Sequence, residues 1–372
     1  IWKKTTKNQI AKPGFHGGNN AALENWQGDA TSGLTDNTIS QSITGLPNGT
    51  YVFGAYIGAS VHAAEENREA VTGVTLFAND ASVPVATNNP DAGTKWGHTA
   101  KFNVAVNVVD GTLKVGLKAE ATTANFLIWD NATLYYFGDM DAAAALDEMA
   151  KIDMAATVAI ADTCVAYKMQ VDTLAYLNEQ IAAGKALAGA ADAYQVDEDV
   201  YWAIRLANKS IADYRGLSNA VVSAREVAAK EWSVHVADAV EALNALIAEA
   251  DGMYETAIAG RGEIADKKAA LSEASALVEL DSSYTNLDII DLWIDDTEPG
   301  EALGEYSEEM INRVVDLLEE VRVVLAESEE GVFSAVRAKH LCDSLYALIA
   351  DVQANPITFN EFPIVLGPSE TA

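Results

Sequence analysis

Hydrophobic and polar residues alternate along several short segments of the first 138 residues. The alternation is clearest in the segments 50–58 and 101–117, where the apolar positions are Tyr51, Phe53, Ala55, Ile57, Phe102, Val104, Val106, Val108, Leu113, Val115 and Leu117. A spacing of two residues is that of a β-strand with one buried face. Asp110-Gly111 interrupts the second segment and is typical of a tight turn, so we expect the strands on either side of it to form a hairpin.

Similar segments at 37–44, 73–79 and 125–137 bring the total to about seven or eight short strands in roughly 130 residues, a density typical of a sandwich or jelly roll. Turn residues separate them, as at 46–49, where proline fixes φ and Asn-Gly tolerates a positive φ. The sequence therefore predicts an antiparallel β-sandwich or jelly roll over residues 1–138.

After Gly138 the spacing of apolar residues changes from two to three or four. Asp141 precedes an alanine-rich run as a helix cap, and no proline occurs between Pro90 and Pro299. Stripes with helical spacing occupy 174–181, 200–217, 232–258, 264–278, 311–325 and 332–349, with breaks at 184–199, 260–262, 280–286, 297–304 and 327–331. We expect an all-α antiparallel bundle of about six helices over residues 139–354, or two three-helix units.

The last residues, 355–372, contain three of the eight prolines of the chain. Because proline cannot continue a helix, we expect an extended C-terminal tail, with residues 357–366 packed back on the bundle.

The charge of the chain divides at the same place as the pattern. Residues 1–138 contain 9 Lys and Arg against 11 Asp and Glu, whereas residues 139–372 contain 15 against 44. The net charge of −31 would repel phosphate groups, which argues against nucleic acid and anionic membranes as partners. No apolar run approaches the ~18 residues that a membrane-spanning helix needs.

Two stretches carry a resemblance to a known fold family. The turn and strand LPNGTY at 46–51 and the closing strand IWDNATLYYFG at 128–138 resemble the galactose-binding-like, or carbohydrate-binding-module-like, jelly rolls of bacterial glycan-handling proteins. The resemblance covers residues 7–138 and implies a fold that often binds sugars. The segments 171–187 and 239–257 are similar to the FIVAR helical repeats of bacterial surface proteins, which implies a spacer; a generic helical bundle is the alternative.

Catalytic motifs are absent from the sequence. It has no nucleophile elbow, phosphate-binding loop, dinucleotide-binding glycine pattern or zinc-protease motif, so we expect no enzyme activity. Cys164 and Cys342 fit no metal motif and are expected to be buried as small hydrophobic residues, with a disulfide between them left open. A group of acidic residues lacks the spacing of a calcium loop and is expected to be a solvated helix end: Asp288, Asp291, Asp295, Asp296, Glu298 and Glu301.

The strand region contains several residues of the types that bind sugars. Sugars are held by aromatic side chains that stack on C–H faces and by amide or carboxylate groups that bracket hydroxyls. Trp96 lies in a polar segment without a core pattern and is the preferred platform; its polar neighbours are Asn88, Asn89, Asp91 and His98. Trp26, which follows Asn25 in an expected loop, is the second aromatic candidate, whereas Trp129 is expected to pack inside. That Trp96 folds back as a lid on the sandwich edge is the alternative.

Asp130 is the one charge inside the closing strand. In the jelly rolls that this domain resembles, an acidic residue of that strand often contributes to a structural calcium site, which implies the same role for Asp130. A carboxylate satisfied by backbone N–H groups is the alternative.

These observations favour a non-catalytic glycan-binding protein, or a module of one, that is secreted or attached to a bacterial surface, with the acidic helices as a spacer. Its expected partner is a glycan or polysaccharide, or another surface protein. The alternatives are a structural or adhesive protein–protein interaction protein and the non-catalytic part of a larger glycoside-processing enzyme. We expect an extracellular or cell-surface location, with the periplasm as second choice, although no signal peptide is seen in the chain.

Overall fold

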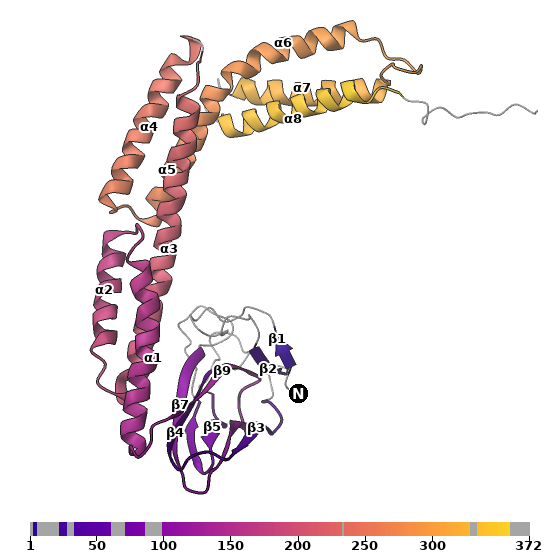
Figure 1. The fold of residues 1–372 in the computed structure, drawn as a ribbon. Helices are drawn as coiled ribbons and strands as arrows, with labels where there is room; N and C mark the ends of the chain where they lie inside the picture. The colour runs from indigo at the N-terminus through magenta and orange to yellow at the C-terminus, as the bar shows by residue number, and fades with distance from the viewer. Residues whose placement is uncertain are drawn as a thin grey trace, which may run out of the picture. The chain divides into compact units, whose positions relative to one another are not determined.

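The computed structural model describes residues 3–5, 22–27, 33–60, 71–85, 99–232, 234–327 and 333–357. The chain divides into two compact units, the first formed by Ile1–Tyr167 with Val171–Lys209 and the second by Lys168–Gln170 with Ser210–Ala372. The first unit holds the β-strands and the helices that follow them directly, and the second is helical (Figure 1). The domain limits expected from the sequence, 1–138, 139–354 and 355–372, stay a prediction.

Two antiparallel sheets make up the strand region of the described residues. The first has the order β1 (Lys3–Thr5), β2 (Ala22–Trp26), β9 (Phe126–Tyr136), β4 (Gly49–Ser60), β7 (Thr99–Val108). The second has the order β3 (Asn37–Thr44), β8 (Thr112–Ala119), β5 (Val74–Ala78), β6 (Ala81–Pro84). The predicted fold class, an antiparallel β-sandwich followed by helices, is therefore confirmed.

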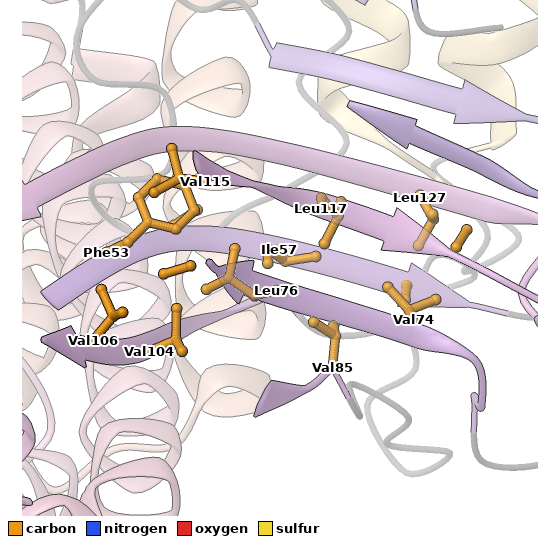
Figure 2. Close-up of a cluster of buried hydrophobic side chains, with 14 of the residues drawn as sticks. Phe53, Ile57, Val74, Leu76, Val85, Val104, Val106, Val115, Leu117 and Leu127 are labelled. Carbon is orange, nitrogen blue, oxygen red and sulfur yellow. The ribbon is translucent and has the colours of Figure 1, made fainter. Parts of the chain in front are cut away.

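The facing sides of the two sheets enclose one hydrophobic core. Phe53 and Ile57 of β4 lie in a single cluster with Leu76 of β5 and Leu117 of β8 (Figure 2). All the alternating apolar residues named from the sequence belong to this cluster, with Phe102 partly buried at its border. Because each fully buried side chain of this size contributes about 1.5–3 kcal/mol, the two-residue spacing decides which face of each strand turns inward.

The turn at Asp110-Gly111 is present, but the predicted hairpin is wrong. Asp110 Oδ1 accepts a hydrogen bond from Thr112 N at 2.9 Å, and Gly111 has a φ of 72°. The strands on either side belong to different sheets, because β7 pairs with β4 whereas β8 pairs with β3 and β5. A strand that returns in the facing sheet buries the same alternate residues as a hairpin partner does, so periodicity does not distinguish the two.

Strand β4 is buried on both faces, not on one as its alternation predicted. Its second face carries Val52, which is fully buried against Ala145 and Met149 of α1 (Ala142–Cys164). Ala105 of β7 and Leu146 of α1 pack at the border of this contact. Helix α1 therefore covers the outer side of the five-stranded sheet.

The two stretches that carry the family resemblance are neighbours in the first sheet. Tyr51 pairs with Tyr136 across β4 and β9, with ring centroids 4.8 Å apart, and Tyr136 Oη donates to Asn48 O at 3.0 Å. Gly49 has a φ of 140°, and a Cβ there would lie 2.6 Å from Gly138 O. These residues fasten the end of the closing strand to the turn, so their role in the structure is architectural.

Eight α-helices follow within the described residues, where about six were expected. They are α1, α2 (Val171–Lys185), α3 (Ala190–Ala228), α4 (Ala237–Thr256), α5 (Arg261–Glu279), α6 (Asp281–Asp296), α7 (Glu308–Ala326) and α8 (Ala335–Ala354), with a short 3₁₀ turn, η3 (Val234–Val236), before α4. The predicted cap is confirmed, since Asp141 Oδ1 accepts from Ala143 N and Ala144 N at 3.0 Å.

Three helix boundaries differ from the prediction. Helix α3 begins inside the expected break because Asp147 Oδ1, from α1, accepts from Ala190 N at 2.8 Å and so caps it from a distance. Helix α6 occupies most of another expected break, since buried Leu280 is the single residue between α5 and α6. Trp232 lies before α4, and its Nε1 donates to Val227 O at 2.8 Å.

Two hydrophobic clusters lie in the described part of the second unit. One gathers residues of α3, α4 and α5 around Leu243, and the other gathers residues of α5 to α8 around Leu318. Cys342 belongs to the second cluster, and Cys164 of the first unit is also buried; neither forms a disulfide. The expected acidic helix end lies at the end of α6 and in the segment after it.

Only the first three residues of the expected tail are described. Ile357 N donates to Glu305 O at 2.9 Å, and Gly304 N donates to Ile357 O at 3.0 Å. The start of the tail is thus hydrogen-bonded to the loop between α6 and α7, and the expected packing of the remainder lies outside the described residues.

Candidate functional site

The first candidate region is one end of the five-stranded sheet. Trp26 pairs with Phe126, which pairs with Ser60 on its other side, and Gly58 pairs with Thr99. The last residues of β2 and β4 and the first residues of β9 and β7 therefore meet at this end. Three strand spacings separate Trp26 from Thr99, about 15 Å.

The residues nominated around Trp96 are joined to the sheet at this end through Thr99. These nominated residues, Asn88, Asn89, Asp91, Trp96 and His98, lie outside the described residues, so their binding role stays a prediction.

Trp26 is on the strand, not in the loop that was expected. It is the last residue of β2, and alternation turns Asn25 inward, where it is 4% exposed, and Trp26 outward, where it is 51% exposed. The backbone beside it is held, because Gln27 N donates to Asn125 O at 2.9 Å and Asn125 N donates to Ser60 O at 3.2 Å. An indole that is half exposed on a rigid strand has the placement that a stacking platform needs.

Asp130 lies in the middle of β9, opposite Tyr56, next to the register shift between Gly54 and Tyr56. Asn131, the following residue, has a φ of 51°. Within the part of the chain that the structure describes, no three His, Cys, Asp or Glu side chains are grouped to hold a metal ion. The calcium role expected for Asp130 stays a prediction. Trp129, by contrast, packs against the sandwich core as predicted.

The second candidate region is a cavity of about 440 Å³ at the edge strand β7 of the same sheet, lined also by β6, α1 and the start of α3. Its apolar lining includes Val83 and Pro84 of β6, Phe102 of β7 and Met154 of α1. Its polar lining comes from four elements: Tyr56, Lys101, Asn103, Asp153, Tyr194 and Asp197. All of these residues belong to the first unit.

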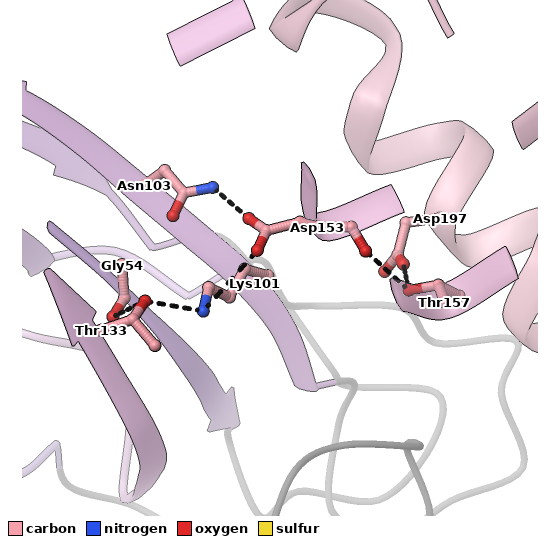
Figure 3. A network of polar contacts seen from close by, with 7 residues as sticks. All are labelled: Gly54, Lys101, Asn103, Thr133, Asp153, Thr157 and Asp197. Carbon is pink, nitrogen blue, oxygen red and sulfur yellow. Dashed lines mark hydrogen bonds and ion pairs between the residues drawn. The ribbon is translucent and has the colours of Figure 1, made fainter. Parts of the chain in front are cut away.

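A chain of polar contacts runs along one wall of this cavity (Figure 3). Asn103 Nδ2 donates to Asp153 Oδ2 at 2.7 Å, while Asp153 Oδ1 lies 3.9 Å from Lys101 Nζ. The Lys101 ammonium also donates to Thr133 Oγ1 at 3.1 Å and sits 5.2 Å from the centre of the Tyr56 ring. On the helical side, Thr157 Oγ1 donates to Asp197 Oδ1 at 2.9 Å and ties α1 to α3.

Glycine at position 54 makes room for this arrangement. Gly54 pairs with Asn103 across β4 and β7, and a Cβ on Gly54 would lie 2.0 Å from Asn103 Oδ1 and 3.0 Å from Lys101 Cε. Both side chains therefore lie over a gap in the sheet face that only glycine leaves open.

Burial disfavours both charges of the Lys101–Asp153 pair. The side chains are 9% and 21% exposed. Desolvation raises the pKa of Asp153, and neighbouring Asp197 raises it further, against the lowering effects of Lys101 and Asn103. Desolvation likewise lowers the pKa of Lys101, and Asp153 only partly offsets it. Two charges are thus kept in an environment that favours their neutral forms.

Sequence reasoning missed this second region. Lys101 and Asn103 occupy the polar positions of β7, and such alternating polar positions predict a solvent-exposed face. Asp153, which contacts both, comes from a helix about fifty residues later in the chain. One signal was available: Asp153 lies four residues from both Met149 and Thr157, which are buried on α1. A carboxylate on the buried stripe of a helix indicates a partner on another element.

Comparison with known proteins gives no family assignment. No family profile matches the chain, and no curated protein is significantly similar to it. Among solved structures, it is similar to TmCBM61 in complex with β-1,4-galactotriose, at 18% identity over 37% of this chain and 82% of that one, with a TM-score of 0.27.

Two further structures are similar to the chain. The K1 cleaved adhesin domain of Lys-gingipain from Porphyromonas gingivalis is 19% identical over 37% of this chain and 91% of that one, with a TM-score of 0.24. CBM35 from Cellvibrio japonicus Abf62 is 14% identical over 38% and 100%, with a TM-score of 0.20. At this level of similarity the matches carry no functional conclusion for this chain.

Proposed function

We propose that the β-sandwich is a non-catalytic carbohydrate-binding module whose binding surface is the sheet end at Trp26. The observation that carries the proposal is the half-exposed indole of Trp26 on a strand whose backbone is hydrogen-bonded to β9. Leaving half of an indole in water loses roughly 1–2 kcal/mol of the free energy that its full burial would contribute. Stacking on the C–H face of a sugar ring would cover this apolar surface.

The proposal includes the residues nominated around Trp96, which lie outside the described residues. Thr99, the first described residue after them, lies across β9 and β4 from Trp26. A second tryptophan with amide, carboxylate and imidazole neighbours would supply the hydrogen bonds that fix the orientation of a sugar.

The remaining features of the proposal concern the setting of the module. The acidic helices, with FIVAR-like segments at 171–187 and 239–257, act as a spacer, and the protein is secreted or displayed on a bacterial surface. The concentration of negative charge after residue 138 supports a solvated spacer. No helix in the described part of the chain is long and apolar enough to cross a membrane.

Affinity electrophoresis tests the proposal. The full chain runs in native gels that contain a soluble galactan, xylan, mannan or mixed-linkage glucan, and one of these is expected to retard it. Trp26→Ala should greatly reduce the retardation. Tyr135→Ala is the matched control, because Tyr135 is also an exposed aromatic residue of this sheet but pairs with Val52 at the opposite end of β4. Normal migration of the wild-type chain in every gel, or equal retardation of wild type and Trp26→Ala, would overturn the proposal.

A further inference from the structure

We propose that the 440 Å³ cavity between β7 and helices α1 and α3 is a second saccharide site, which takes a neutral mono- or disaccharide. This inference rests on the proposed function, since it extends sugar binding to a second place in the same unit. The volume lies within the range of about 300–1,000 Å³ that is usual for small-molecule sites.

The gap in the ion pair is the first observation that points to a ligand. Asp153 Oδ1 and Lys101 Nζ are 3.9 Å apart, too far for a hydrogen bond. Lys101 has three N–H donors, and among the described residues its hydrogen bond goes to Thr133. A hydroxyl placed between the two groups would accept from the ammonium and donate to the carboxylate, and would restore hydration that burial has removed.

The charges of the lining select the chemical class. Asp153 and Asp197 would repel an anion, and the Lys101 ammonium would repel a cation placed between Lys101 and Asp153. A wholly apolar molecule would leave the Lys101–Asp153 pair desolvated without new partners. A neutral polyhydroxyl compound, with donors and acceptors on one edge, avoids all three costs.

Aromatic and apolar groups supply the other half of a sugar site. Tyr194 of α3 is exposed at the cavity, and Phe102 of β7 is partly buried in its wall. The C–H face of a pyranose ring stacks on such rings while its hydroxyls reach the polar wall. Because Asp153, Tyr194 and Asp197 come from the helices, the strands alone would provide only half of this site.

Calorimetric titration of the full chain tests the inference, with the disaccharides β-1,4-galactobiose, cellobiose, xylobiose and mannobiose as probes. Trp26→Ala serves as the background, because it removes the platform of the first site. One of these sugars is expected still to bind to this variant. Adding Tyr194→Ala or Asp153→Asn should weaken the remaining binding about tenfold, the loss from one stacking contact or one charge-assisted hydrogen bond.

Two matched controls keep the result specific. Tyr167→Ala removes another exposed tyrosine, and Asp162→Asn removes a carboxylate of α1 that pairs with Lys185 outside the cavity; both should leave binding unchanged.

If the Trp26→Ala chain binds none of the sugars that wild type binds, or binds them equally after Tyr194→Ala or Asp153→Asn is added, the second site is refuted and the proposed function is unaffected. If wild type binds none, both proposals fail. If the sugar-bound chain shows only water between Lys101 and Asp153, the inference is likewise overturned.

Discussion

Replacement of Asp153 by asparagine is expected to raise the stability of the first unit. At an effective dielectric constant of about 20, charges 3.9 Å apart attract by about 4 kcal/mol. The raised pKa of Asp153 and the lowered pKa of Lys101 show that desolvation exceeds this attraction for each group. Asp153→Asn leaves Lys101 without its carboxylate, but it keeps an acceptor for Asn103 and resembles the neutral carboxyl that burial favours. We therefore expect a net gain of about 1 kcal/mol, or about 3 °C in Tm.

The assay is urea and thermal unfolding at neutral pH, fitted as separate transitions where the two units do not unfold together. Asp162→Asn on the same helix is the control, since its exposed pair with Lys185 should contribute less than about 0.5 kcal/mol. A loss of about 3 kcal/mol or more from Asp153→Asn would refute the reasoning, because it would mean that attraction in the pair exceeds desolvation.

The same variant has a defined pH dependence. A carboxyl whose pKa is raised in the folded state contributes stability that is fully present below its unfolded pKa, near 3.8, and lost as the pH rises through its folded pKa. The advantage of Asp153→Asn over wild type should therefore shrink as the pH falls from neutral through the folded pKa of Asp153. An advantage that grows on acidification would contradict the assigned direction of the shift.

Three other changes probe the sheet and its cover. Gly54→Ala should cost about 2 kcal/mol in urea unfolding, because its Cβ would overlap Asn103 Oδ1; a neutral result would show that Asn103 can move away. Val52→Ala should cost about 2 kcal/mol and speed amide exchange in α1, since Val52 is buried against that helix; unchanged exchange would contradict the packing. The calcium role expected for Asp130 predicts that added Ca²⁺ raises the Tm of wild type but not of Asp130→Asn; equal responses would contradict it.

The periodicity of apolar residues predicted most of the fold, because burial of one face of a strand places an apolar residue at every second position. The same signal misled where two arrangements bury identical positions. The strands on either side of Asp110 show the alternation of a hairpin, although they lie in different sheets. Helix α3 starts early for a related reason: its cap, Asp147, comes from another helix and leaves no local mark.

The two candidate regions differ in how much of each could be predicted from the sequence. The sequence predicts Trp26 as a binding residue because it is an aromatic residue in an expected loop; the residue lies on β2 with its side chain half exposed, and its binding role stays a prediction. The cavity is not predictable from local sequence, because its polar wall joins Lys101 and Asp153 across fifty residues of chain and two kinds of secondary structure. Its lining depends on the packing of α1 against the sheet, which no local pattern specifies.

Calorimetric titration of wild type and Trp26→Ala with the polysaccharide that retards the chain most tests the central claim directly. We predict saturable binding to wild type and at least a large loss of affinity in Trp26→Ala, with Tyr135→Ala like wild type. Absence of heat with every polysaccharide, or equal affinity in wild type and Trp26→Ala, would contradict carbohydrate binding at this end of the β-sandwich.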